Sequence, residues 1–172
     1  MYQLKDFRFP KDFKFGVADA DLQVIGEKHT LRYENSEPTM WTHFAKSSPV
    51  VYQNKTPLEG IDRYHRWKED IVLMKRLGIK DYRTSISMAR VMTQEGKPNY
   101  KALDWYKTYF SHLRKNDITI YTTLYHWELP QYLSEKGGWK NRETIDYFLE
   151  HVRITYQYLN EYIDEYFIIN EP

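Results

Sequence analysis

The chain has 172 residues, of which 41% are hydrophobic and 28% charged, and its formal net charge is +1. This balance argues against disorder and against a nucleic-acid or anionic-membrane partner, because such partners select a strongly basic face. The absence of cysteine excludes disulfides, thiolate metal sites and a cysteine nucleophile. We predict one domain over residues 1–172.

The segment 1–6 has no apolar stretch of the kind that a signal peptide carries, and no run approaches the ~18 apolar residues of a membrane span. We therefore expect a cytoplasmic protein. Aromatic residues make up 17% of the chain. A large core accounts for most of them, and the functional alternative is a carbohydrate cleft in which flat rings stack on sugar faces.

In chain order, residues 13–20 predict a short buried strand. The polar, proline-containing segment 27–60 predicts a long loop with a helical turn near Met40–Phe44. Asp62 is a typical N-cap, and Gly78 is typical of a helix end. Between them, apolar residues at spacings of three and four predict a helix, namely Tyr64, Trp67, Ile71, Met74 and Leu77.

The second half of the chain continues the alternation. Residues 79–86, 118–125 and 166–169 predict strands. Asn99 and Asn141 are the expected caps of two further helices. The apolar stripe of the first is Leu103, Tyr106, Phe110 and Leu113, and that of the second is Ile145, Phe148, Val152 and Leu159.

The order β-α-β-α-β-α-β predicts an α/β fold with a parallel sheet and right-handed crossovers. An eight-stranded (β/α) barrel and a doubly wound open sheet both begin in this way. No glycine-rich phosphate loop follows a strand, which weakens the dinucleotide-binding version and a nicotinamide-dependent enzyme.

Polar residues collect where the predicted strands end. The first strand leads to Gln23, the second carries Arg83 and Ser85 and leads to Arg90, the third ends in His126-Trp127-Glu128, and the fourth ends in Asn170-Glu171. In a (β/α) barrel this is the active-site face.

Each of these residues also has a structural interpretation. Gln23 could satisfy a loop backbone, and His126 could be a hydrogen-bonded core histidine. Arg83 is expected inside the barrel, where a buried guanidinium needs a carboxylate partner such as Glu171. Glu128 is interpreted as a carboxylate that organises its loop. For Asn170 and Glu171 the functional interpretation is favoured, because they follow an apolar strand.

Seven segments resemble glycoside hydrolase family 1, which includes β-glucosidases, β-galactosidases and 6-phospho-β-glycosidases. They occur in family order from residue 9 to the last residue. The segments are Phe9-Pro10-Lys11-Asp12-Phe13, Phe15-Gly16-Val17-Ala18, Tyr64-His65-Arg66-Trp67-Lys68-Glu69-Asp70, Tyr82-Arg83-Thr84-Ser85-Ile86-Ser87, Thr123-Leu124-Tyr125-His126-Trp127-Glu128-Leu129-Pro130, Gly137-Gly138-Trp139 and Asn170-Glu171-Pro172.

The resemblance implies a (β/α)8 TIM-type barrel and a retaining double displacement without cofactor or metal. It implies that Glu171 is the general acid/base and that Arg83 supports the nucleophile. The sugar would be held by Gln23, His126, Trp127 and Asn170. The implied substrate is a β-glycoside or a 6-phospho-β-glycoside.

The chain departs from the family at several positions. A Glu commonly stands where Ile25 is found, an aromatic residue where Leu22 is found, a Trp at Met88 and an Asp at Glu128. These changes bear on the choice of sugar more than on the fold.

The sequence contains no Thr-Glu-Asn-Gly-like motif, which carries the nucleophile in the family, and it supplies about four of eight strands. Half a barrel has two open edges, which invite pairing with another chain. We therefore expect a fragment or an oligomer, with a complementary C-terminal half or self-association as the partner. The alternatives to a β-glycosidase part are a non-catalytic carbohydrate-binding protein and a degenerate half barrel.

Overall fold

The computed structural model describes residues 8–48, 51, 53 and 55–172. Its centre is a parallel sheet of four strands in the order β1-β2-β3-β4, formed by β1 (Gly16–Ala18), β2 (Asp81–Ser85), β3 (Thr119–Tyr125) and β4 (Glu165–Ile169). All four predicted strands are confirmed, and the first is shorter than predicted. Segment 1–6, where we looked for a signal peptide, lies outside the described residues.

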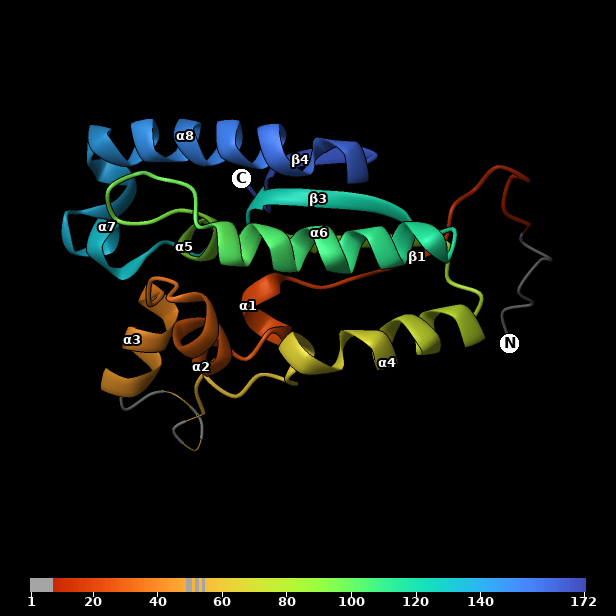
Figure 1. Cartoon of the computed structure of the whole chain (residues 1–172), viewed down its shortest axis with the longest axis horizontal. Helices are drawn as coiled ribbons and strands as arrows, with labels where there is room; N and C mark the ends of the chain where they lie inside the picture. Colours follow the sequence, from red (N-terminus) through yellow and green to blue (C-terminus); the bar gives the residue numbers. More distant parts are fainter. Residues whose placement is uncertain (1–7, 49–50, 52, 54) are drawn as a thin grey trace, which may run out of the picture.

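Three long helices connect the strands, namely α4 (Arg63–Arg76), α6 (Tyr100–Lys115) and α8 (Arg142–Leu159). Figure 1 shows them side by side along the sheet. Each strand pairs with the next one in the sequence. Right-handed crossovers that always step in one direction place every helix on the same face, whereas a doubly wound sheet reverses direction. The strand order therefore favours the barrel of the two predicted folds.

The helix ends follow local chemistry. Gly78 has φ 70° and closes α4, with the N–H of Ile79 donating to the carbonyl of Met74 at 2.9 Å. The side chain of Asn141 caps α8 by accepting from the N–H of Glu143 at 3.0 Å. Asp62 and Asn99 occupy the predicted N-cap positions, but neither side chain makes a capping hydrogen bond.

The connections contain more structure than predicted. The segment predicted as a loop with one helical turn holds α2 (Glu27–His29), a π-helix (Thr30–Glu34) and α3 (Met40–Ser47). Figure 1 shows the short helices gathered at the end where the strands finish. The others there are α1 (Asp21–Val24), α5 (Met88–Val91), α7 (Gln131–Glu135) and a 3-10 turn at Gly138–Lys140. A second 3-10 turn, Asn160–Tyr162, follows α8 and lies at the opposite end, where β4 begins. The sequence pattern did not reveal these short helices, because helices of this length are not stable on their own and depend on packing against the rest of the protein.

The core lies between the sheet and the helices. Tyr82 and Ile120 are fully buried on that face, and the predicted stripe of α6 is confirmed as buried. At the end of α4, Leu77 belongs to the apolar spacing that predicted the helix, but it is the C-cap residue and is 75% exposed. On α8 the buried residues are Thr144, His151, Ile154, Thr155 and Leu159, so only Leu159 of the predicted stripe is fully buried.

The opposite face of the sheet has no helix layer over it among the described residues. Lys14, Asp81 and Tyr121 are linked there, beside the exposed apolar residues Val17 and Phe167. The Tyr121 hydroxyl accepts from Lys14 Nζ at 2.9 Å and donates to Asp81 Oδ1 at 2.9 Å. At the N-terminal end of this face a Cβ on Gly16 would lie 2.4 Å from the carbonyl oxygen of Asp81, so only glycine allows β1 to approach β2 so closely. No described helix is long and apolar enough to cross a membrane.

Candidate active site

Two residues that follow strands β3 and β4 have an unusual backbone conformation. Glu171 is exposed and has φ 47°. Trp127, which follows β3, has φ 64° and is 41% exposed. Both are non-glycine residues in the left-handed region. Such backbone strain persists only where surrounding contacts hold it, and it clusters at functional sites.

Asn170 links the ends of β2, β3 and β4. It is buried, and its N–H donates to the carbonyl of Tyr125 at 3.0 Å. Its side-chain Oδ1 accepts from Arg83 Nη2 at 2.7 Å, and its backbone carbonyl accepts from Trp127 Nε1 at 2.8 Å. These bonds hold the residue next to Glu171 in one position.

The predicted ion pair between Arg83 and Glu171 is wrong for this structure. The guanidinium donates instead to Asn170 and, through Nε, to Thr123 Oγ1 at 2.9 Å. It also lies 4.8 Å from the ring centre of Phe167. The physical reason is that Arg83 is only partly buried on the open face. Its charge therefore needs no buried carboxylate.

His126 is partly buried beside these groups. Burial, followed by the positive charge of Arg83, lowers the pKa of His126, and the negative charge of Glu171 acts in the opposite direction. Its Nδ1 has no hydrogen-bond partner among the described residues. That nitrogen is buried, so the neutral ring has one hydrogen-bonding atom that the described residues leave unsatisfied.

A cavity of about 510 Å³ brings together three of the predicted residues, Gln23, His126 and Trp127. Gln23 is exposed, and its Oε1 accepts from the N–H of Ala20 at 3.2 Å, so the structural interpretation of this residue also holds. Asn170, Arg83 and Glu171 adjoin this group without lining the cavity. Leu22, at the position where the family resemblance implies an aromatic residue, lies in the wall.

One wall was not predicted. Trp41, Phe44 and Ala45 of α3 line the cavity, and Trp41 Nε1 donates to the carbonyl of Trp127 at 2.6 Å. The spacing of the two aromatic residues, which places them on one side of a helical turn, was the available signal. A helical turn was predicted near Met40–Phe44, but it was not assigned to the site because the surrounding segment was interpreted as a loop.

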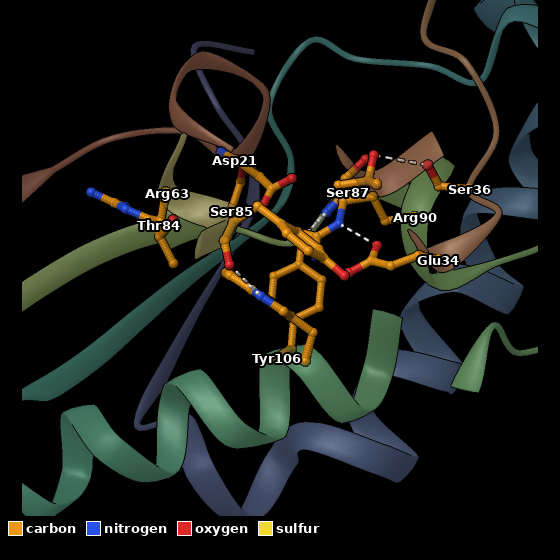
Figure 2. A network of polar contacts seen from close by, with 12 residues as sticks. Asp21, Glu34, Ser36, Arg63, Thr84, Ser85, Ser87, Arg90 and Tyr106 are labelled. Atoms are coloured by element: carbon orange, nitrogen blue, oxygen red, sulfur yellow. Dashed lines mark hydrogen bonds and ion pairs between the residues drawn. The ribbon is translucent and has the colours of Figure 1, made fainter. Parts of the chain in front are cut away.

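A buried polar network supports the cavity floor (Figure 2). Arg90 is fully buried, and its guanidinium binds both oxygens of Glu34 at 2.7 and 2.9 Å and Asp21 Oδ1 at 2.7 Å. Figure 2 shows Arg90 and Glu34 pointing toward one another, with Tyr106 rising from α6 toward them. Asp21 belongs to α1, the short helix that also carries Gln23. The network thus fixes α1 to α5.

Glu128 is buried and is not among the cavity-lining residues. Burial, and then the negative charge of Asp21, raises its pKa to about 8. Its neighbours in the chain join two loops, because the N–H of Met40 donates to the carbonyl of Leu129 at 3.0 Å. Because this bond is made by the backbone of Leu129 and not by the carboxylate, the role of Glu128 in organising its loop stays a prediction.

Comparison with known proteins decides the family. A sequence model described as glycosyl hydrolase family 1 matches residues 5–172. The chain belongs to glycosyl hydrolase family 1. Beta-glucosidase A of Acetivibrio thermocellus is 41% identical to this family 1 chain over 165 residues, which are 95% of this chain and 36% of that protein. Myrosinase 1 of Brevicoryne brassicae is 37% identical over 171 residues, which are 97% and 36% of the two chains.

Solved structures agree. The family 1 β-glucosidase from Thermotoga maritima superposes with a TM-score of 0.88 at 37% identity, covering 95% of this chain and 37% of that one. The AHE enzyme from Alicyclobacillus herbarius gives a TM-score of 0.90 at 40% identity, covering 96% and 37%. The predicted partial TIM barrel is confirmed, and the family 1 chain spans just over a third of the length of these relatives.

Proposed function

We propose that this chain supplies the sugar-binding cleft and the general acid/base of a retaining β-glycosidase. The observation that carries the proposal is the position of Glu171, which follows β4 beside His126, Trp127 and Asn170 at the open end of the barrel. A Thermotoga maritima relative has been solved in complex with deoxynojirimycin. This supports a glycoside-type ligand for the family cleft.

In the proposed reaction Glu171 donates a proton to the glycosidic oxygen as the bond from that oxygen to C1 breaks. A second carboxylate, about 5–5.5 Å away, attacks C1 and forms a glycosyl-enzyme. Glu171 then takes a proton from the water that releases the sugar. The second carboxylate has no family motif in these 172 residues, so it must come from outside them.

The surrounding residues have distinct roles in this proposal. Asn170 binds the sugar 2-hydroxyl, a contact that strengthens in the transition state, and Arg83 holds its amide. Gln23 and His126 bind other hydroxyls, and the ring of Trp127 stacks on the sugar. The substrate is a β-glycoside, either free or phosphorylated at its 6-hydroxyl.

The proposal is tested in a chimera in which this chain replaces the matching part of the Acetivibrio thermocellus β-glucosidase. We expect the chimera to hydrolyse 4-nitrophenyl β-glucoside. Glu171→Ala should slow the release of sugar from the glycosyl-enzyme at least a hundredfold, because general acid/base catalysis contributes about 10²–10⁴-fold. Azide should restore turnover and give a β-glycosyl azide, since an anion needs no general base.

Glu165→Gln is the matched control, because Glu165 is an exposed carboxylate on the same strand. It should leave the rate unchanged. An active chimera that retains full activity without Glu171 would contradict the assignment, as would loss of activity that azide does not restore.

The isolated chain should behave differently from the chimera. Large apolar side chains are exposed on both edge strands and beside them, including Phe15, Val17, Phe167, Ile168 and Ile169. An unpaired strand edge with such residues favours association. We expect oligomers in size-exclusion chromatography and little hydrolysis of aryl β-glucosides. A monodisperse monomer, or turnover that Glu171→Gln abolishes, would contradict this expectation.

The second candidate function is carbohydrate binding without hydrolysis. It is favoured by the aromatic cavity, whose lining residues all lie in this chain. Sugar binding by the isolated chain without turnover, lost on Trp127→Ala or Gln23→Ala, would support it.

A further inference from the structure

Two histidines and an aspartate converge outside the candidate active site. They are His29 at the end of α2, Asp62 at the N-cap of α4 and His65 in the first turn of α4. Asp62 Oδ1 lies 3.2 Å from His29 Nε2 and 2.8 Å from His65 Nδ1. One ligand atom of each residue lies within 4.8 Å of the other two.

The carboxylate of Asp62 is turned away from the role that its position predicts. Asp62 has φ 58°, a left-handed conformation, and its side chain makes no capping bond to α4. It is directed instead to the two imidazoles. The carboxylate oxygen is therefore placed at the three-residue cluster instead of in an N-cap hydrogen bond.

Backbone contacts hold the two sides of the cluster together. A Cβ on Gly60 would lie 2.7 Å from the backbone nitrogen of Gly26. The N–H of Lys28 donates to the carbonyl of Leu58 at 3.1 Å, and that of Tyr64 donates to the carbonyl of Ile25 at 3.1 Å. These contacts therefore hold the two ends of the segment between His29 and Asp62 close together without a metal ion.

The imidazole of His29 is also held in place. Its ring stacks on Tyr33 at an interplanar angle of 4° and on Tyr64 at 17°. These contacts fix the orientation of the ring, which favours coordination because a ligand that is already positioned loses less freedom when it binds a metal ion.

From this geometry we propose that His29 Nε2, Asp62 Oδ1 and His65 Nδ1 bind one divalent transition-metal ion of the zinc class. Imidazole and carboxylate ligands suit zinc, with bonds of about 2.0–2.2 Å. Tetrahedral coordination at that length separates neighbouring ligand atoms by about 3.3 Å, close to the separations from Asp62 to each imidazole. Small side-chain rotations are sufficient to close the site, and water takes the fourth position.

The ion would join α2 to α4 and so clamp the segment that runs between them. That segment carries α3, whose Trp41 and Phe44 line the cavity. A cross-link at both ends of a long connection lowers the entropy of its unfolded state. The site is structural and takes no part in the proposed hydrolysis.

The test uses the 172-residue chain purified without a polyhistidine tag and dialysed against a chelator. We expect isothermal titration with zinc chloride to show one ion per chain, and cobalt(II) to give the visible absorption of a tetrahedral site. Saturating zinc should raise Tm by about 5 °C. His65→Gln and Asp62→Asn should each weaken zinc binding at least tenfold.

His43→Gln is the matched control, because His43 is an exposed histidine on α3 outside the cluster. It should bind zinc as the parent chain does. Circular dichroism and Tm in the presence of chelator establish that each variant is folded. This check is needed for His65→Gln in particular, because the ring of His65 makes edge-to-face contacts with His29 and Tyr64. Absence of zinc binding, binding that survives the combined replacement of all three residues, or an equal loss in His43→Gln would overturn the proposal. In that case Asp62 simply accepts a hydrogen bond from each imidazole.

Discussion

Replacing Arg90 by methionine is expected to lower the free energy of unfolding by about 3–5 kcal/mol, the loss typical of breaking a buried ion pair from one side. The guanidinium makes three charge-assisted hydrogen bonds to Asp21 and Glu34. It also lies 4.6 Å and 4.4 Å from the ring centres of Trp105 and Tyr106. Methionine fills similar space, but it leaves both carboxylates buried without a cation.

Urea unfolding followed by circular dichroism measures this loss. Arg90→Lys keeps the charge but not the two-pronged contact with Glu34, so an intermediate loss is expected. Arg153→Met is the matched control, since the Arg153–Glu150 pair on α8 is exposed and such pairs contribute about 0–1 kcal/mol. If Arg90→Met were no more harmful than Arg153→Met, the network would not be the anchor described here.

Glu128 is expected to make stability fall as pH rises through neutrality. Its pKa is raised from 4.5 to about 8 in the folded chain, so the folded state binds more protons than the unfolded state between these values. Stability is therefore fully present below the unfolded pKa and is lost as pH rises through the folded one. Between pH 6.5 and 8.5 the loss should be about 2 kcal/mol, at about 1.4 kcal/mol per pKa unit.

Glu128→Gln removes this dependence, because a neutral amide of similar shape has no proton to lose. As pH rises, the free energy of unfolding of this variant should therefore increase relative to that of the parent chain. Below pH 6.5 a second group acts in the opposite direction, since burial lowers the pKa of His151 to about 4 and stability is lost as pH falls through that interval. The window above pH 6.5 therefore excludes His151. Burial also raises the pKa values of Asp21 and Glu27, so the comparison of the parent chain with Glu128→Gln is what separates the contribution of Glu128.

Urea unfolding of the parent chain, Glu128→Gln and Glu135→Gln at a series of pH values provides the measurement. Glu135 is an exposed carboxylate on α7, and its replacement should leave the slope unchanged. A parent chain whose stability stays flat or increases from pH 6.5 to 8.5 would contradict the prediction, and so would a Glu128→Gln variant with the parent slope.

Both predictions bear on function through α1. Arg90 holds Asp21, and Asp21 lies two residues before Gln23 in the same short helix. The network and Glu128 therefore support the cavity without lining it. Loss of sugar binding in Arg90→Lys, with Gln23 itself intact, would follow from a shifted α1.

The long elements and the family could be predicted from the sequence. Helical spacing identified α4, α6 and α8, because each buries one stripe against the sheet. Apolar runs identified β2, β3 and β4. In β2 and β3 most residues are buried, whereas β4 is an edge strand with exposed apolar residues. Asn170-Glu171 could be singled out because polar residues directly after an apolar strand are costly unless a site uses them.

Only the tertiary structure decided how these residues are held. Gln23, His126 and Trp127 are far apart in the chain and meet because parallel strands end at one side of the sheet. Arg83 pairs with Asn170 rather than with Glu171, since it is half-exposed and its charge needs no carboxylate. Asp62 was correctly placed as an N-cap, but its carboxylate is directed to two imidazoles, because the contact between Gly26 and Gly60 brings α2 against α4. Local spacing determines which residues form helices and strands, whereas the partner of a polar side chain depends on burial and on contacts distant in sequence.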